Sequence, residues 1–297
     1  MLLAAYNGRR WLPEQVDSIF GQEGVAVTLF VSVDLSSDDT EGWFDQLQAQ
    51  RDDVVVLPHG LRFGGAARNF FRLLQDVSLD GFDHVAFADQ DDVWLPGKLA
   101  RAHRVITEQQ VDAYSSDVLA FWPDGREQHV TKSQPQVAFD YLFEAAGPGC
   151  TYVLNIELAR AVQDSLRCHR AEVGQVALHD WYCYAYARAN GYTWFIDDHA
   201  LMRYRQHGGN QIGVNTGLKA FRARLAQVFE GWWLDQSRLI ARLTGVHDTP
   251  FVRSWSSMSR LGLARLALNC RRCRRRGRDQ LFFALLCLGL AVRGGGK

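Results

Sequence analysis

Three carboxylate side chains lie close together in the first third of the chain. Asp89, Asp91 and Asp92 directly follow the apolar run 84–88, which is typical of a buried strand. Carboxylates this close raise one another's pKa, so the arrangement is costly unless water or a cation relieves the repulsion. Mg²⁺ commonly binds one or two carboxylates together with substrate phosphates. The triplet therefore indicates either a site for a metal-bound phosphate ligand or an acidic turn before the helix that begins near Pro96.

The elements around the triplet predict where it lies in the fold. Strand-like runs end near residues 5, 34, 57 and 88, and stretches with helical spacing of apolar residues lie between them. Alternating strands and helices predict an α/β fold with a mostly parallel sheet, and ligands bind beyond the carboxyl ends of its strands. Asp34 and Asp89 both fall at such ends.

The composition indicates a globular protein with a substantial core, since 47% of the 297 residues are hydrophobic and 22% are charged. Only Cys270 and Cys273 of the six cysteines form a C-x-x-C pair, and no second pair completes a zinc site, so all six are expected to be reduced cytosolic thiols. The chain passes within a few residues of Met1 into a strand-like run, so no signal peptide is expected.

The C-terminal part differs from the rest in charge. From Phe251 onward, Asp279 is the one acid among eleven arginines and lysines, although the whole chain has a formal net charge of zero. The segment Arg271–Arg278 directly precedes an apolar run, 281–292, which is too short to span a bilayer as a helix. This order is typical of a segment that rests on anionic lipid at the membrane surface. A solvated helical extension is the alternative, and no nucleic-acid-binding motif is present.

Between the two parts, five residues at helical spacing predict a helix face that packs into a core. They are Phe221, Leu225, Val228, Phe229 and Trp232.

The segment from Asp89 to Leu99, D-Q-D-D-V-W-x-P-x-K-L, resembles the metal-binding DXD segment of family 2 glycosyltransferases in the form of their rhamnosyltransferase-like members. The resemblance implies a GT-A fold, with Asp89 and Asp91 flanking Mg²⁺ or Mn²⁺ on the diphosphate of a nucleotide sugar. Residues 1–215 would then form the nucleotide-sugar-binding and catalytic domain, and residues 216–297 a helical, basic extension.

Two upstream segments extend the resemblance to the donor side. A-Y-N-G at residues 5–8 resembles the family's T-Y-N-G, which places Tyr6 against the nucleotide base. Asp34 matches the base-binding Asp of the family's D-D-G-S-x-D-x-T, although Val33 and Leu35 replace its first Asp and its Gly. Taken singly, Tyr6 could equally be a surface aromatic and Asp34 a turn residue. The resemblance also implies donor contacts by three further residues: Ala4, Arg68 and Gln90.

Two later segments resemble the acceptor side of the family's site. The G-C-T segment makes Gly149 and Cys150 acceptor-binding residues by resemblance. An inverting transfer needs one base to take the proton of the acceptor hydroxyl. H-D-W at residues 179–181 is similar to the family's catalytic-base segment, so the resemblance makes Asp180 that base, and Trp181 would stack on a sugar. From the residues alone, Asp180 is equally an ordinary helix cap.

The segment from Tyr204, Y-R-Q-H, resembles a family loop in which Arg205 would neutralise diphosphate and His207 would complete the metal shell. The resemblance thus implies an inverting, metal-dependent transfer of rhamnose from dTDP-rhamnose to a glycan or lipid-linked acceptor. This would belong to cell-surface polysaccharide synthesis, in the cytoplasm at the inner face of the cell membrane. A UDP- or GDP-sugar donor, or a non-catalytic nucleotide-sugar-binding or assembly protein, stays as an alternative.

Overall fold

The computed structural model describes residues 1–207 and 231–294, and the chain divides into two compact units. Unit 1 comprises Met1–Ser133, Ala146–Cys183 and Tyr192–Asn210. Unit 2 comprises Gln134–Ala145, Tyr184–Gly191 and Gln211–Lys297. The domain boundary expected at residue 215 lies outside the described residues, as do the first four residues of the apolar face expected at 221–232. Unit 2 thus also takes two segments from the middle of the chain.

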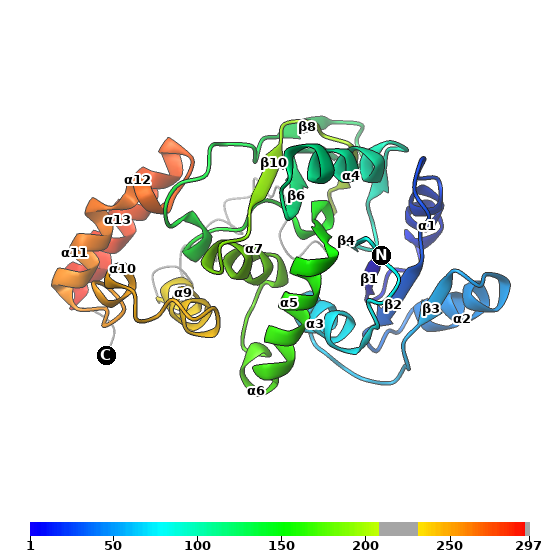
Figure 1. Cartoon of the computed structure of the whole chain (residues 1–297), viewed down its shortest axis with the longest axis horizontal. Coiled ribbons are helices and arrows are strands. Elements are labelled where there is room, and N and C mark those ends of the chain that lie inside the picture. The colour runs from blue at the N-terminus through cyan, green and yellow to red at the C-terminus, as the bar shows by residue number, and fades with distance from the viewer. Residues whose placement is uncertain (208–230, 295–297) are drawn as a thin grey trace. The chain divides into compact units, whose positions relative to one another are not determined.

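Unit 1 is built on a seven-stranded sheet of order β10-β6-β9-β4-β1-β2-β3 (Figure 1). Strand β9 pairs antiparallel with β4 and β6, and the other neighbours pair in parallel, which confirms the mostly parallel α/β sheet. The strands are β1 Leu2–Ala5, β2 Leu29–Val33, β3 Val54–Val56, β4 His84–Ala88, β6 Ala113–Ser116, β9 Val153–Asn155 and β10 Trp194–Asp197.

The strand register brings two acidic turns to one edge of this sheet. Strand β1 lies between β2 and β4, with Ala5 opposite Val33 and Leu3 opposite Ala88. Asp34 therefore follows the end of β2, and the acidic turn from Asp89 follows the end of β4, at the carboxyl edge that binds ligands in parallel sheets.

Helices of unit 1 pack on the sheet through apolar stripes, as α1 and α3 show. Leu12, Val16 and Ile19 of α1 are buried in the same core as β1, β2 and β3, as the helical spacing predicts. Helix α3 packs against β1, β2 and α5. Asn155 caps α5, since its side chain accepts a hydrogen bond from the Leu158 N–H. The helices are α1 Leu12–Phe20, α2 Thr40–Gln50, α3 Ala66–Asp76, α4 Lys98–Gln109, α5 Ile156–Cys168, α6 Arg170–Val173 and α7 His179–Ala189.

A second, four-stranded sheet of order β5-β11-β7-β8 joins distant parts of unit 1. Its strands are β5 Val93–Trp94, β7 Val118–Phe121, β8 Glu127–Val130 and β11 Met202–Arg205. Met202 lies opposite Trp94 in the antiparallel β5–β11 pair. This pairing brings residues 205–207 beside the acidic turn.

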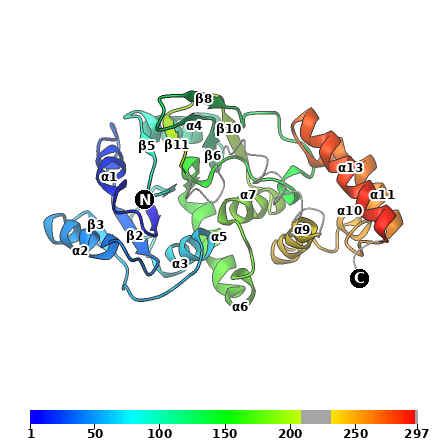
Figure 2. The same cartoon turned by 180° about the vertical axis from the view of Figure 1, so that it is seen from behind.

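Unit 2 consists of helices, which confirms the C-terminal helical part of the expected fold (Figure 2). It contains α9 Trp232–Leu243, α10 Pro250–Arg253, α11 Arg260–Leu268, α12 Cys270–Cys273 and α13 Gly277–Arg293, together with the short helix η1 Asp140–Leu142. Its core includes Phe143, Trp255, Leu263, Phe283 and Cys287. All six cysteines of the chain are free. Within the described ranges, each helix is too short or too polar to cross a bilayer.

Part of the basic segment Arg271–Arg278 is structural, so not every arginine of the segment is available to lipid. Arg275 is buried, lies 3.7 Å from a carboxylate oxygen of the fully buried Asp140, and donates a hydrogen bond to the Ala145 carbonyl. Arg274 donates to the Phe143 carbonyl and lies 3.6 Å from Glu144. These two arginines therefore balance the buried Asp140 and the half-buried Glu144 inside unit 2, which leaves the remaining basic side chains of the segment to meet a partner.

Candidate active site

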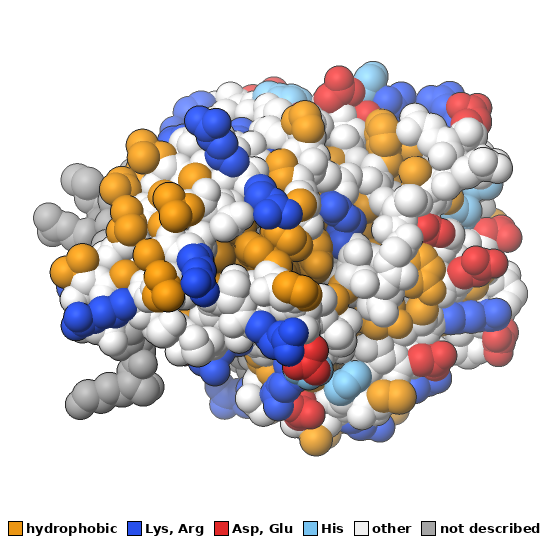
Figure 3. Space-filling model, turned by 60° about the vertical axis from the view of Figure 1, so that its left-hand side comes forward, with side chains coloured by type: hydrophobic (Ala, Val, Ile, Leu, Met, Phe, Trp, Pro, Cys, Tyr) orange, Lys and Arg blue, Asp and Glu red, His pale blue; other side chains and the backbone are white. Residues whose placement is uncertain are grey.

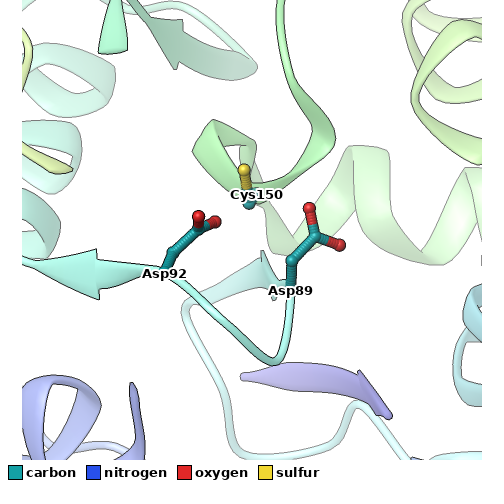
Figure 4. Close-up of side chains that lie close together, drawn as sticks. All are labelled: Asp89, Asp92 and Cys150. Atoms are coloured by element: carbon teal, nitrogen blue, oxygen red, sulfur yellow. The ribbon is translucent and has the colours of Figure 1, made fainter. Parts of the chain in front are cut away.

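The acidic turn after β4 forms a compact group with Cys150. Carboxylate oxygens of Asp89 and Asp92 and the sulfur of Cys150 all lie within 4.8 Å of one another. Figure 4 shows both carboxylates directed toward the thiol, which the short helix η2, Gly149–Thr151, carries over the turn. Asp92 and Cys150 are fully buried, and Asp89 is partly exposed. Of these two carboxylates, solvent can reach that of Asp89 but not that of Asp92.

The carboxylates in this group have strongly perturbed proton affinities. Burial, with the neighbouring Asp91 charge, raises the pKa of Asp89 to about 7. Burial and the charges of Asp91 and Asp89 also raise the pKa of Asp92 well above its ordinary value. The pKa of the Cys150 thiol is raised as well, by burial and by the two carboxylates, so this side chain is a neutral thiol at pH 7. A neutral thiol is a poor ligand for a hard cation.

The group fits a hard divalent cation through its oxygens. The Oδ2 atom of Asp92 is buried and has no hydrogen-bond partner among the described residues, although buried polar atoms are normally paired. Three acidic side chains within four residues concentrate negative charge that a cation would relieve. Oxygen ligands of this kind suit Mg²⁺ or Mn²⁺.

The second expected metal ligand, Asp91, lies against His207. The Nε2 atom of His207 is 2.6 Å from Asp91 Oδ2, and its ring stacks on Trp11 with centroids 5.5 Å apart. Arg205 Nε also donates to the Asp91 carbonyl at 2.7 Å. The β5–β11 pairing creates this contact between Asp91 and His207 across 116 residues of sequence, whereas the side chains grouped with Asp89 are those of Asp92 and Cys150.

Arg205 lies at the same edge but is already engaged by protein groups. Its NH2 atom is 2.5 Å from Glu14 Oε2, and its guanidinium lies over the rings of Trp11 and Phe121 at 4.5 and 4.6 Å. Its backbone N–H donates to Asp92 Oδ1 at 3.1 Å. The sequence does not predict the roles of Glu14 and Trp11, because an exposed acid in a helix and an aromatic residue just before one carry no local signal of a site.

A lysine that the sequence analysis did not single out lies under the acidic turn. Lys98 is buried, and its Nζ lies 3.4 Å from the centroid of the Trp94 ring. Burial lowers its pKa to about 7, although the nearby Cys150 and Asp92 oppose that shift. Its Nζ has no hydrogen-bond partner within the described part of the chain. A partly charged lysine there offsets some of the charge of Asp92. The sequence feature that could have indicated this lysine is its position in the D-Q-D-D-V-W-x-P-x-K-L segment.

On the donor side, Gln90 fixes Tyr6 through its backbone. The Gln90 amide accepts from the Tyr6 N–H at 2.7 Å and donates to the Tyr6 carbonyl at 2.8 Å. The Tyr6 side chain stays 52% exposed, so it is free to meet a ligand. Ala4 lies within β1, opposite Ser32, with its side chain buried. A Cβ on Gly8 would lie 2.3 Å from Gln90 Oε1, so a side chain there would displace the amide that fixes Tyr6.

Asp34 and Arg68 both contact the loop that precedes α3. The two oxygens of the buried Asp34 carboxylate accept from the N–H groups of Phe63 and Gly64, each at 2.8 Å. The exposed Arg68 donates to the carbonyls of Gly174 and Phe63 at 2.9 and 3.4 Å. Asp34 therefore shapes this loop, and each of its oxygens keeps one lone pair for a further donor.

Asp180 lies at the start of α7 and is electrostatically coupled to the acidic turn. Burial raises its pKa to about 6, while the hydrogen bond from the Trp181 N–H, the Lys132 charge and further backbone donors oppose the shift. That bond, to Asp180 Oδ1, is 2.7 Å long. The Asp180 charge in turn contributes to the raised pKa of Asp89. Asp180 is thus close enough to Asp89 for its charge to raise the pKa of that carboxyl.

Asp180 is held in place by its buried neighbour His179. The His179 ring stacks on Phe70 with centroids 3.9 Å apart and meets the edge of Phe87. Burial lowers its pKa to about 3, so the ring is neutral. A Cβ on Gly149 would lie 2.6 Å from His179 Nε2 and 3.1 Å from the Asp180 Cβ. The glycine is therefore required for packing around the expected base.

Two residues expected to bind the acceptor are enclosed instead. Trp181 is 3% exposed, so its ring packs in the core and no sugar can lie on it in this conformation. Cys150 is fully buried and faces the carboxylates of the acidic turn. Burial depends on packing between distant segments, which the local pattern of either residue does not report.

Comparison with known proteins identifies relatives over most of the chain. Residues 1–241 match the family described as glycosyltransferase like family 2. A dTDP-rhamnosyl transferase of Shigella flexneri, RfbG, is 37% identical over 287 residues, which cover 96% of this chain and 99% of that protein.

Solved structures with the same fold include two further proteins. S. aureus TarS 1–349 in complex with UDP-GlcNAc superposes with a TM-score of 0.51 at 14% identity, covering 98% of this chain and 88% of that one. The chain spans 52% of a longer TarS structure. The mannosyltransferase PcManGT from Pyrobaculum calidifontis, in complex with GDP-Man and Mn²⁺, superposes with a TM-score of 0.52 at 16% identity, covering 98% and 85%. These likenesses show the GT-A fold.

Proposed function

Because this chain belongs to glycosyltransferase family 2, we propose that it transfers rhamnose from dTDP-rhamnose to a glycan or lipid-linked acceptor with inversion at the sugar. The observation that carries the proposal is the acidic turn of Asp89 and Asp91 coupled electrostatically to the single carboxylate of Asp180. A metal site and one base are the minimum equipment of an inverting transfer. The S. flexneri relative, named for dTDP-rhamnose, supports the choice of donor.

The donor would lie along the carboxyl edge of the sheet. The exposed ring of Tyr6, fixed by Gln90, would lie against the nucleotide base, and the free lone pairs of Asp34 would accept from it. Asp89 and Asp91 would hold Mg²⁺ or Mn²⁺, with His207 beside Asp91. Bound there, the cation would neutralise diphosphate charge and favour departure of the nucleotide. Arg205 would act indirectly, by orienting the Asp91 backbone.

Asp180 would take the proton from the attacking hydroxyl. With a pKa of about 6, its carboxylate is mostly ionised at pH 7 and is still more basic than an ordinary Asp. The hydroxyl oxygen would attack the anomeric carbon on the face opposite the leaving diphosphate, which inverts the configuration there. No second carboxylate nucleophile is required, in contrast to retaining hydrolases.

The basic C-terminal part supports a location at the cytoplasmic face of the cell membrane, in cell-surface polysaccharide synthesis. That face carries a negative surface potential, which attracts clustered arginines. A lipid-linked acceptor would be presented at the same surface.

A second candidate is a transferase of the same fold with a UDP- or GDP-sugar donor. The departures at Val33 and Leu35 from the base-binding pattern favour testing it, and structures of this fold hold UDP-GlcNAc or GDP-Man.

Calorimetry on the full chain separates these donors. We expect dTDP-rhamnose to bind with Mn²⁺, to lose at least tenfold in affinity without it, and to lose as much in Asp91→Ala. The exposed Asp52→Ala should bind like the native protein. Tight binding of a UDP- or GDP-sugar with no binding of dTDP-rhamnose would overturn the donor, and binding of no nucleotide sugar would overturn the donor site.

A further inference from the structure

Helix α13 carries an apolar stripe that the described residues of unit 2 leave uncovered. Its inner side, including Phe283, Leu286, Cys287 and Leu290, is buried in the core of the unit. Its outer side presents five further apolar side chains that are between 46% and 81% exposed. These are Leu281, Phe282, Leu285, Leu288 and Val292. Four of them recur at intervals of three or four residues, so they form one continuous stripe along the helix.

Helix α11 extends this stripe into a two-helix face. Helices α11 and α13 pack against each other, and Arg260 at the start of α11 lies near Gly294 after the end of α13, so the helices run antiparallel. Leu261 and Leu268 of α11 are 61% and 85% exposed. We call the exposed apolar side chains of both helices, with the arginines beside them, the α11/α13 face.

The charge around this face is predominantly positive. Arg265 lies between Leu261 and Leu268 on α11, and Arg271 follows in α12; both are exposed and form no ion pair with a described residue. The single acid in this part of the chain, Asp279, lies near Arg274 and Arg278. In Figure 3, apolar and basic side chains gather over one part of the surface, and acidic ones are sparse there. A partner must therefore provide an apolar region that can bury these side chains and negative charge that can pair with the arginines.

We propose that the α11/α13 face docks on an anionic lipid bilayer, with its leucines and Phe282 in the interface and its arginines on the headgroups. Helix α13 has 17 residues, about 25 Å at 1.5 Å per residue, and lies in the membrane plane because it does not qualify as a span. A second copy of this chain is a poorer occupant, because it would bring arginines of the same sign together. The inference stands independently of the donor sugar.

Flotation of the full chain with vesicles tests this proposal. Vesicles of phosphatidylcholine with 30% phosphatidylglycerol should carry the native protein, and vesicles of phosphatidylcholine alone should carry at least tenfold less. Each arginine near an anionic surface is worth about a fivefold change in partitioning, so Arg265→Gln with Arg271→Gln should bind about 25-fold more weakly. The control Arg104→Gln, at an exposed position of α4, should bind like the native protein.

A separate variant tests whether the apolar side chains of the face contribute to vesicle binding. Leu281→Ser, Leu285→Ser and Leu288→Ser together should lose at least tenfold in vesicle binding, while Val55→Ser, at an exposed strand position of unit 1, should not. Nucleotide-sugar binding should survive in each variant, which shows that the fold is intact. Equal vesicle binding by all variants would overturn the proposal. So would concentration-dependent dimerisation of the native chain that the triple Ser variant abolishes, with no lipid binding by either.

Discussion

The assignment of Asp180 as the base makes a sharp prediction for Asp180→Asn. The substitution keeps the shape of the side chain and removes its ability to accept the proton. A positioned general base contributes about 10²- to 10⁴-fold to a rate, so kcat should fall by that factor. Donor affinity should change little, because Asp180 belongs to the acceptor side of the proposed site. The exposed Asp52→Asn variant is the matched control and should retain native kcat.

The pH dependence of the native rate gives the same assignment a second, independent test. Burial raises the pKa of Asp180 to about 6, so about ten molecules are ionised for each protonated one at pH 7, and about one for each ten protonated at pH 5. The rate should be nearly constant above pH 7 and should fall about tenfold between pH 7 and pH 5. Asp89 also has a raised pKa, of about 7, but a bound cation favours its ionised form. With saturating Mn²⁺, the fall in rate at acidic pH is therefore determined by protonation of Asp180.

Hydrolysis of the donor, with water in place of the acceptor hydroxyl, allows this assay before the acceptor is known. Initial rates of nucleotide release would be measured from pH 5 to pH 8 for the native chain, Asp180→Asn and the control. If Asp180→Asn keeps more than a tenth of the native rate, or if the native rate does not fall at acidic pH, the reasoning is wrong. Asp180 would then be a helix cap, consistent with its bond to the Trp181 N–H.

Three further outcomes follow from the same structure. The pKa of about 7 at Asp89 means that protons compete with the cation, so calorimetry should show Mn²⁺ affinity falling about tenfold between pH 6 and pH 5; an unchanged affinity would exclude Asp89 as a ligand. Gly149→Ala places a Cβ 2.6 Å from His179 Nε2 and should lower the free energy of unfolding in denaturant by about 1–3 kcal/mol, whereas Gly174→Ala, with open space around it, should change it by less than about 0.5 kcal/mol. Arg275→Met leaves buried acids of unit 2 with less compensation and should cost about 3 kcal/mol in the same measurement; a neutral result would mean that those acids are protonated.

The sequence predicts the α/β sheet well because its signals are local. Apolar runs followed by polar turns mark β1, β2, β3 and β4, and parallel order follows from the helices between them. The antiparallel pairing of β9 and the pairing of strands in the second sheet could not be predicted in this way. Both depend on pairing between segments far apart in the chain, such as Met202 with Trp94, and local periodicity carries no information on such pairs.

The membership of unit 2 shows the same limit. Gln134–Ala145 and Tyr184–Gly191 precede the basic tail by many residues, yet they belong to its unit. Asp140 is fully buried there, with Arg275 and Arg188 3.7 and 3.2 Å away. From the sequence, a run of arginines indicates a charged surface, because a buried arginine is rare unless an acid pairs with it. The paired acid lies more than a hundred residues away, so the composition of the tail alone could not separate Arg275 from its exposed neighbours.

The three carboxylates of the acidic turn illustrate what spacing shows and what it leaves out. Spacing shows that Asp89, Asp91 and Asp92 are crowded, but it does not show which of them is exposed. In the structure, Asp89 is partly exposed, whereas Asp92 is enclosed by Cys150 and accepts a hydrogen bond from the Arg205 backbone N–H. A buried carboxylate needs compensation, which comes from a strand that pairs much later in the chain and from Lys98 below the turn. Asp92 therefore fastens the turn to the fold, and Asp89 is the carboxylate of the three that is partly exposed.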